Sequence, residues 1–346
     1  MGHKCFDVAV IGAGFGGLAT ALSLQNSGLS VALVDSLDKV GGRAYSEHHK
    51  PGYIFDRGPS IITAPFLIDD LFTKTKARRE DYCKFVPVDP YYKVIFHDGS
   101  EISHFHSFEK LLAEVKKISP EDEQGVKDFF CYADKIFQTG FVKLGDKYFS
   151  NTLSMVGVAP NLLRLNAIRP VYKAVSQFVK HEKLRQFLSF HPLLIGGNPF
   201  HTCAVYSLIN SLERAYGIYH PVGGMHVLAQ GIQKRFAELG GETFLSQPIE
   251  KIDQDNENLF HLTSSKGENL RAKKIVVNAD MGHFVKNVLS GRAKPVKLAK
   301  KLASAKYSMS AFLMYFGTKK QWPELAQHSI ILGPRYKELL DDIFKT

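Results

Sequence analysis

A run of glycines directly after a short apolar segment limits what the start of this chain can fold into. Residues 6–11 read Phe-Asp-Val-Ala-Val-Ile, which is typical of a buried parallel strand. Gly12-Ala13-Gly14-Phe15-Gly16-Gly17 follows, and Leu18 to Asn26 then has helical spacing and ends before Gly28. A second apolar segment, Ser30 to Val34, completes a strand–loop–helix–strand unit of about thirty residues.

The spacing of these glycines matches the G-x-G-x-x-G pattern of dinucleotide-binding loops. Gly12 allows the tight turn out of the strand, Gly14 lets the backbone approach a pyrophosphate, and Gly17 lets the helix pack against the sheet. Backbone N–H groups at the start of the helix then face the phosphates. Asp35 ends the second strand 23 residues after Gly12, where an acid can bind a ribose hydroxyl. We therefore expect residues 12–17 and Asp35 to bind a dinucleotide.

Gly41-Gly42-Arg43 stands shortly after Asp35 and narrows the choice of dinucleotide. Arg43 carries a fixed cation whose planar fork of N–H donors suits phosphate oxygens. An isolated arginine of this kind is most often an ordinary surface residue. Together with the glycine loop and Asp35, however, the Gly-Gly-Arg resembles the FAD signature of glutathione-reductase-like and amine-oxidase-like flavoproteins. The resemblance implies FAD as the cofactor, bound in part through Gly42 and Arg43.

Four further segments resemble the bacterial-type phytoene desaturases, in the order in which that family has them. Gly52 to Ser60 follows the pattern G-x-x-F-D-x-G-P-[ST], and the others are Ser189 to Phe200, Tyr219 to Met225 and Gly333 to Leu339. The similarity extends over essentially the whole chain and is greatest to the lycopene-forming type. It implies an FAD-dependent oxidoreductase acting on CH–CH groups, which desaturates phytoene towards lycopene in carotenoid biosynthesis by hydride transfer from allylic carbons to flavin.

The same resemblance assigns further residues to the cofactor site. These residues are Pro59, Ser60, Gly223, Gly224, Ile249, Asn278 and Asp280. The first four lie in loops that would approach the flavin ring, Ile249 would lie near the adenine, and the last two would lie at a strand end near the cofactor. Taken singly, the paired glycines are also typical of a plain turn, Ile249 of a core strand, and Asp280 of a helix N-cap.

The order of the elements predicts an α/β protein of two domains. We expect a Rossmann-type, glutathione-reductase-like FAD-binding domain that is assembled from separated segments, residues 1–75 and 221–290. An α+β substrate domain is inserted, formed by residues 76–220 and 291–346, with a helical and membrane-facing part over about 107–190. The FAD-binding domain should also contain a helix from Met225 to Leu239, which Gly240 terminates.

Local signals predict two elements of the substrate domain. Asp98-Gly99 between two apolar runs predicts a β-hairpin over residues 91–105. Ser119 is expected to cap a helix whose first residue is Pro120, because serine is a favoured N-cap and proline is favoured at the first helical position.

Residues 125–180 read as largely helical, with interruptions at Pro160 and Pro170. Between Asn161 and Leu188, apolar and basic residues alternate at helical spacing. This pattern is typical of a helix on a membrane surface, and equally of a helix packed on its own domain with a solvated charged face. The net charge of +10 favours an anionic membrane, and phytoene dissolves in membranes. We therefore expect a cytoplasmic protein that associates peripherally with the inner membrane.

Several other kinds of partner and site are not expected. No nucleic-acid-binding module is present, and glycines interrupt the apolar run at residues 8–24, which argues against a signal peptide or a membrane span. The four cysteines lie far apart and are read as free thiols. His191, His201 and His220 lack metal-ligand spacing, so no metal site is expected. The oligomeric state stays open, a homo-oligomer included.

Two departures from the family pattern matter. Relatives commonly carry an Arg-Asp pair, proposed to handle protons, where this chain has Asn151-Thr152-Leu153-Ser154. The catalytic acid and base are therefore unknown. Relatives also continue beyond the last matching residue, Phe344, with a second glycine-rich segment that covers the flavin ring, and residues 281–346 do not supply one. We expect a fragment that lacks the C-terminal part of its family.

Two other functions remain open. The chain could be a desaturase or oxidase of another carotenoid, with a C30 chain or a later intermediate as substrate. It could also be a non-enzymatic isoprenoid-binding protein of the same fold. The intact glycine loop, Asp35 and Arg43 argue against that last function, because a protein without flavin does not need them.

Overall fold

The structure is a computed structural model that describes residues 4–50, 52–145, 159–266, 269–305 and 307–344. The chain divides into two compact units, the first formed by residues 1–86 and 219–306 and the second by residues 87–218 and 307–346. Residues 76–86, 219–220 and 291–306, which the sequence assigns to the substrate domain, thus belong to the first unit. The reason is packing, because Cys83 and Leu298 join its two apolar clusters.

The first unit contains a six-stranded sheet with the strand order β10-β11-β12-β1-β2-β9. These strands are β1 (Cys5–Ile11), β2 (Val31–Val34), β9 (Glu242–Phe244), β10 (Ile249–Gln254), β11 (Phe260–Ser264) and β12 (Asn269–Val277). β12, β1, β2 and β9 run parallel, and β11 and β10 continue the sheet as antiparallel strands. The predicted strand–loop–helix–strand unit at the start of the chain is confirmed.

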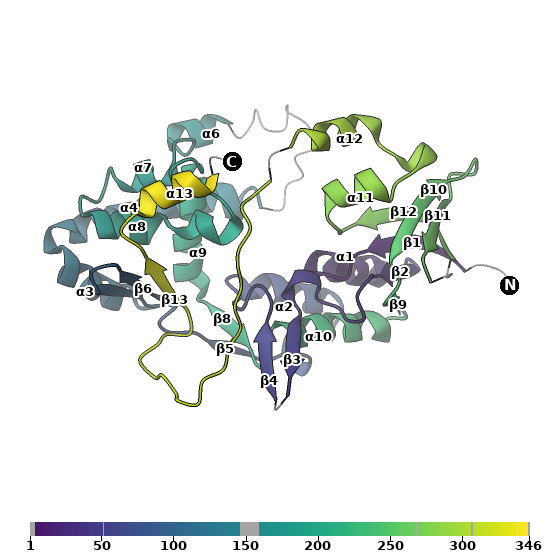
Figure 1. The fold of residues 1–346 in the computed structure, drawn as a ribbon, viewed down its shortest axis with the longest axis horizontal. Helices are drawn as coiled ribbons and strands as arrows, with labels where there is room; N and C mark the ends of the chain where they lie inside the picture. Colours follow the sequence, from purple (N-terminus) through teal and green to yellow (C-terminus); the bar gives the residue numbers. More distant parts are fainter. Residues whose placement is uncertain (1–3, 51, 146–158, 267–268, 306, 345–346) are drawn as a thin grey trace. The chain divides into compact units, whose positions relative to one another are not determined.

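Helices cover both faces of this sheet (Figure 1). They are α1 (Phe15–Asn26), α10 (Met225–Glu238), α11 (Met281–Asn287) and α12 (Val296–Ala303). Val8 and Val10 of β1 pack in one apolar cluster with α1 and α10, whereas Ala9 and Ile11 pack in a second cluster with α11 and α12. Because side chains alternate across a strand, both faces of a parallel strand must be apolar, and β1 and β2 are.

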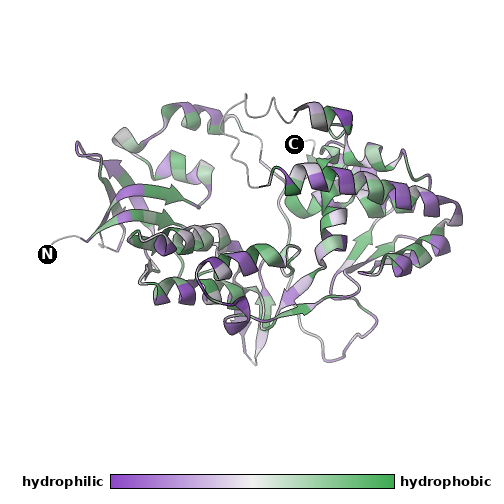
Figure 2. Ribbon diagram, turned by 180° about the vertical axis from the view of Figure 1, so that it is seen from behind, coloured by the Kyte–Doolittle hydropathy of each residue, from purple (hydrophilic) through white to green (hydrophobic). Residues whose placement is uncertain are grey.

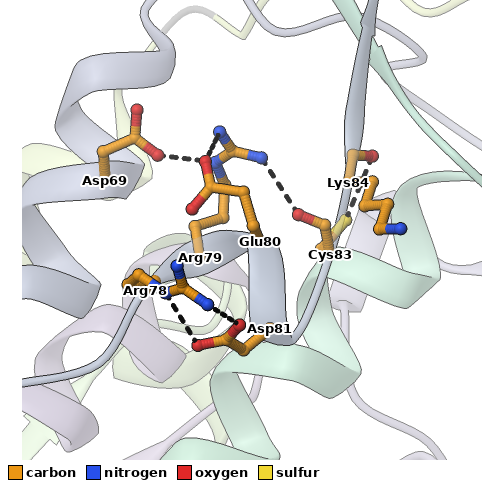
Figure 3. A network of polar contacts seen from close by, with 7 residues as sticks. All are labelled: Asp69, Arg78, Arg79, Glu80, Asp81, Cys83 and Lys84. Carbon is orange, nitrogen blue, oxygen red and sulfur yellow. Dashed lines mark hydrogen bonds and ion pairs between the residues drawn. The ribbon is translucent and has the colours of Figure 1, made fainter.

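The first unit also contains a small two-stranded sheet and an arginine whose side chain is largely buried. The small sheet pairs β3 (Ser46–His49) with β4 (Tyr53–Asp56). Figure 3 shows Arg79 in the turn between α2 (Pro65–Lys74) and β5 (Phe85–Pro87). Its guanidinium donates to Asp69 at 2.5 Å and to the carbonyl oxygen of Cys83 at 3.0 Å. Its side chain is only 10% exposed, so these bonds fix the path of the chain into β5.

The second unit combines a three-stranded sheet with helices. β6 (Tyr92–Phe96) pairs with β7 (Glu101–His104) as the predicted hairpin and with β13 (Ser329–Leu332) in parallel. The described helices are α3 (Phe108–Ile118), α4 (Glu123–Phe137), α6 (Ala159–Arg164), α7 (Val171–Val175), α8 (Glu182–Ser189), α9 (Leu208–Tyr216) and α13 (Tyr336–Phe344). In Figure 2 these helices alternate between hydrophobic and hydrophilic colours, as helices with one buried face do.

Two sequence predictions for the second unit are wrong in detail. Ser119 does not cap the helix with its side chain, because its hydroxyl donates to Asp122 at 3.1 Å and a 3-10 turn, Pro120–Asp122, precedes α4. The basic tract at 161–188 breaks at Pro170, as the sequence predicts, but it is not otherwise the continuous amphipathic helix that its spacing indicates. Within its described part it forms three short helices, since Asn166 adopts a left-handed φ of +52° and Pro170 precedes α7.

A buried group of polar and aromatic side chains lies in the second unit. The hydroxyl of Tyr92 is 3.1 Å from Nε2 of His191, which is 3.3 Å from Oε2 of Glu213. His104 stacks on Tyr91 with ring centroids 5.2 Å apart, and its ring nitrogens have no hydrogen-bond partner among the described residues. Burial lowers the pKa of His104 to about 4, so its ring is neutral at pH 7.

Candidate functional site

The segments that follow three parallel strands meet at one edge of the large sheet. Gly12 follows β1, Asp35 follows β2, and Asn278 follows β12. Because the strands are parallel, their carboxyl ends lie at the same edge, which is where open α/β sheets bind ligands. The structure therefore brings the glycine loop, Asp35 and Asn278 together, although 243 residues separate the last two.

Close packing around the glycine loop leaves no room for a side chain at Gly12 or Gly17. A Cβ atom on Gly17 would overlap the carbonyl oxygen of Gly12. A Cβ atom on Gly12 would lie 2.8 Å from the carbonyl oxygen of Asn278, and the φ of Gly12 is +101°. The loop can therefore approach a ligand only through its backbone.

The loop offers unpaired backbone donors at the start of α1. The N–H groups of Gly14 and Gly16 form no hydrogen bond with any residue in the described ranges. The N–H group of Gly17 donates to Oδ1 of Asn278 at 3.0 Å, which fixes the helix start. Unpaired donors and the positive end of a helix dipole favour an anion with several oxygens, such as a pyrophosphate.

Asp35 is held against the loop by backbone donors. Its Oδ2 accepts the N–H of Ala13 at 2.6 Å, and its Oδ1 accepts the N–H of Leu37 at 2.9 Å. An ionised carboxylate has about four acceptor positions, so two remain for ribose hydroxyls. Ala13 is fully buried and Phe15 packs against the apolar cluster, so their side chains support the loop and their backbones line it.

The Gly-Gly-Arg turn lies directly beside the glycine loop. The N–H of Gly41 donates to the carbonyl oxygen of Ala13 at 2.8 Å, and a Cβ atom on Gly42 would lie 3.0 Å from Cα of Gly14. Arg43 is exposed and forms neither an ion pair nor a hydrogen bond with any residue that the structure describes. Its guanidinium is therefore available to a phosphate beside the loop.

The segment with the predicted residues Pro59 and Ser60 adjoins the Gly-Gly-Arg turn. A Cβ atom on Gly58 would overlap the carbonyl oxygen of Arg43, so the chain that carries Pro59 and Ser60 runs close to the turn. Pro59 is exposed, and the carbonyl oxygen of Ser60 is 2.8 Å from Nδ1 of His220. That contact connects Pro59 and Ser60 to the strand that leads to Gly223 and Gly224.

Gly223 and Gly224 form the turn before α10, with φ angles of +89° and +99°. A Cβ atom on Gly224 would lie 2.9 Å from Oδ1 of Asp56 and 3.3 Å from Oγ of Ser46. Neither polar residue was predicted from the sequence. The signal for Asp56 was its place in the G-x-x-F-D-x-G-P-[ST] pattern, next to the predicted Pro59 and Ser60.

Two of the predicted site residues have structural partners of their own. Ile249 is the first residue of β10 and packs, partly buried, against the second apolar cluster. The N–H of Gln247 donates to the carbonyl oxygen of Asp35 at 2.8 Å, which brings this stretch of chain to the site. Asp280 accepts the N–H of His283 at 2.7 Å as the N-cap of α11, so its carboxylate is engaged there.

The catalytic acid and base, which the sequence leaves unknown, are not identified by the described residues either. Asn151-Thr152-Leu153-Ser154 lies outside the described residues. His191 is buried with Tyr92 and Glu213, and His220 contacts Ser60, so each has a structural partner. The described residues contain no cluster of His, Cys, Asp and Glu that could hold a metal ion.

Comparison with known proteins shows the family to which the chain belongs. A family model described as "Flavin containing amine oxidoreductase" matches residues 15–345. The chain belongs to this family. An oxidoreductase from Methanosarcina mazei has a similar fold, with a TM-score of 0.61 at 16% identity over 87% of this chain and 65% of its own.

Members of the flavin-containing amine oxidoreductase family with curated names are more similar in sequence. The chain is 39% identical to the "Phytoene desaturase (lycopene-forming)" of Pseudescherichia vulneris, over 97% of this chain and 68% of that protein. It is 37% identical to the "Phytoene desaturase (neurosporene-forming)" of Rhodobacter capsulatus, over 97% of this chain and 64% of that protein. The chain thus spans about two thirds of the length of these relatives.

Membership of the flavin-containing amine oxidoreductase family supports FAD as the cofactor, and the residues present fit it. The unpaired N–H groups of Gly14 and Gly16 suit its pyrophosphate, and the exposed Arg43 suits the same charge. Asp35 retains acceptor positions for a ribose. The glutathione-reductase-like α/β fold that the sequence predicts is confirmed by the family match and by this structural neighbour.

Proposed function

We propose that this chain is an FAD-dependent oxidoreductase that desaturates phytoene towards lycopene in carotenoid biosynthesis. One observation carries the proposal: the 39% identity to a lycopene-forming phytoene desaturase extends across 97% of the chain. The cofactor site supports the proposal. Apart from Ile249, the segments that the family resemblance assigns to FAD are linked to one another by direct contacts within the first unit.

Bound FAD supplies an acceptor for the hydride that leaves an allylic carbon of the polyene. The residues of the chain bind and orient this group. Backbone N–H groups of Gly14 and Gly16 would donate to the pyrophosphate, Asp35 would accept from the ribose, and Arg43 would offset negative charge. Phytoene has no polar group, so its recognition depends on apolar contacts and on shape.

The number of desaturation steps is the finer question. A lycopene-forming and a neurosporene-forming relative are 39% and 37% identical to this chain, so identity alone does not separate their products. Pigment analysis of a phytoene-accumulating host that expresses the chain tests the proposal, with lycopene as the expected product. Neurosporene would correct the number of steps, and unchanged phytoene in cells whose purified chain carries FAD would contradict desaturation.

Membrane association belongs to the same proposal, because the substrate resides in a membrane. The described helices include none that is long and apolar enough to span a bilayer. α12 packs Leu298 and Leu302 on the core and exposes Lys297, Lys300 and Lys301. These lysines form no ion pair with a described residue, so they are available to anionic headgroups.

Replacing Lys297, Lys300 and Lys301 by alanine should weaken binding to anionic vesicles at least tenfold at low salt, since each lysine near such a surface contributes about 1 kcal/mol. Vesicle flotation measures the effect. The control is a triple alanine variant at Lys74, Lys251 and Lys273, which lie outside residues 107–190 and pair with aspartates. Equal binding by the two variants would show that α12 is not the contact.

A further inference from the structure

One carboxylate joins two neighbouring strands to a helix that is distant in the sequence. Asp56, the last residue of β4, stands opposite Ser46 of β3 in the small sheet. Its Oδ1 accepts the hydroxyl of Ser46 at 2.5 Å and the N–H of Met225, the first residue of α10, at 3.1 Å. Asp56 therefore holds the start of α10 against β3 and β4.

The start of α10 depends on this contact for its capping. Gly224 stands at the N-cap position and has no side chain to offer. Asp56 supplies the missing acceptor from another part of the chain, and a carboxylate at a helix N-terminus is favoured by the helix dipole. Gly224 fits so closely against Asp56 that a Cβ atom would lie 2.9 Å from its Oδ1.

A histidine extends the network and fixes its orientation. Nδ1 of His226 is 2.9 Å from Oγ of Ser46. Since the Ser46 hydroxyl donates its only proton to Asp56, the Nδ1–H of His226 must donate to Ser46. Burial and the neighbouring His48 lower the pKa of His226, which favours the neutral ring at pH 7. The Ser46 hydroxyl and the Met225 N–H thus both donate to Asp56, and the Nδ1–H of His226 donates to Ser46.

The same network borders the Gly-Gly-Arg turn. Ser46 comes three residues after Arg43, and the N–H of Arg57 donates to the carbonyl oxygen of Tyr45 at 3.0 Å. A path of contacts therefore leads from Asp35 through the glycine loop to Arg43, and from there through Ser46 and Asp56 to Gly224. Asp56 thus lies near the Gly224 end of this path, far along it from Asp35.

We propose that Asp56 is a positioning residue that holds the Gly223-Gly224 turn in register with the Arg43 turn, and so shapes the flavin-ring end of the cofactor site. This inference rests on the proposed function, because it takes FAD as the ligand. It predicts that the loss of Asp56 disturbs the flavin end of the site but leaves the adenosine diphosphate end intact.

Binding of ADP and of FAD to the same variants separates the two ends. For Asp56→Ala we expect FAD affinity to fall at least tenfold, ADP affinity to change less than twofold, and the near-ultraviolet circular dichroism of bound flavin to change. Asp56→Asn keeps an acceptor oxygen and should restore most of the FAD affinity. Ser46→Ala should have an intermediate effect, because the Met225 contact remains.

Glu47→Gln is the matched control, since Glu47 neighbours Ser46 but pairs with exposed Arg57. It should bind both ligands as the unaltered chain does. An Asp56→Ala variant that binds FAD normally, or that loses ADP and FAD in the same proportion, would overturn the positioning role. If the unaltered chain binds neither ligand, the proposed function fails instead, and the two failures are thus distinguishable.

Discussion

The Gly17→Ala variant should lose FAD binding, with an affinity at least a hundredfold weaker than that of the unaltered chain. The added Cβ atom would overlap the carbonyl oxygen of Gly12, which is backbone and cannot rotate away. Relief requires α1 to move off the sheet, and this movement would displace the N–H groups that we assign to the pyrophosphate. Overpacking of this kind also lowers the free energy of unfolding by about 1–3 kcal/mol.

Quenching of FAD fluorescence on titration with protein measures this affinity, and thermal unfolding reports the stability. Gly333→Ala is the matched control, because a Cβ atom on Gly333 would meet no atom within 4 Å and its φ is not left-handed. The control should bind FAD normally. If Gly17→Ala retained full affinity, the glycine loop would not be the place where the pyrophosphate binds.

The His104→Phe variant should remove part of the acid sensitivity of the protein. His104 has a pKa of about 4 in the folded chain and 6.5 in an unfolded one, chiefly because burial disfavours the charged ring. Glu213 and Asp89 oppose this shift, and His191 adds to it. Between pH 6.5 and pH 4 the unfolded chain binds a proton that the folded chain does not, so stability falls as the pH falls.

Phenylalanine keeps the ring contacts with Tyr91 and Tyr92 but cannot take up that proton. Between pH 6.5 and pH 4, the free energy of unfolding of the variant should therefore fall by about 2–3 kcal/mol less than that of the unaltered chain. At pH 7.5 the variant should be at least as stable as the unaltered chain. Chemical unfolding at several pH values measures this difference. Exposed His201 provides the control His201→Phe, which should leave the pH profile unchanged. Parallel profiles for His104→Phe and the unaltered chain would contradict the assignment.

Local patterns were sufficient to predict the elements that frame the cofactor site. The glycine loop, the strands on either side of α1 and the hairpin at Asp98-Gly99 each depend on residues that are near one another in the sequence. A left-handed φ of +82° at Gly99 accounts for that turn signal. Asp35 could be placed because its spacing from Gly12 reflects the length of one helix.

Long-range contacts were beyond the reach of those patterns. Met225 and Asp56 are 169 residues apart, and no local signal pairs them. The helix start at Ser119 was placed too early, because Asp122 accepts the backbone N–H groups of Lys180 and His181 and this tertiary contact favours a 3-10 turn first. The basic tract was predicted to be helical except at Pro170, whereas residues 176–181 are not helical, and Val175 and Val179 are fully buried inside the second unit.

Titration calorimetry of the purified 346-residue chain with FAD, FMN and ADP tests the central claim most directly. Asp35 is assigned to the ribose of the AMP half of FAD, which FMN lacks, and the glycine loop and Arg43 are assigned to a pyrophosphate of which FMN keeps only one phosphate. We therefore expect FAD to bind, ADP to compete with it at the same site, and FMN to bind at least a hundredfold more weakly than FAD. No binding of FAD, or equal affinities for FAD and FMN, would contradict the assignment of this site.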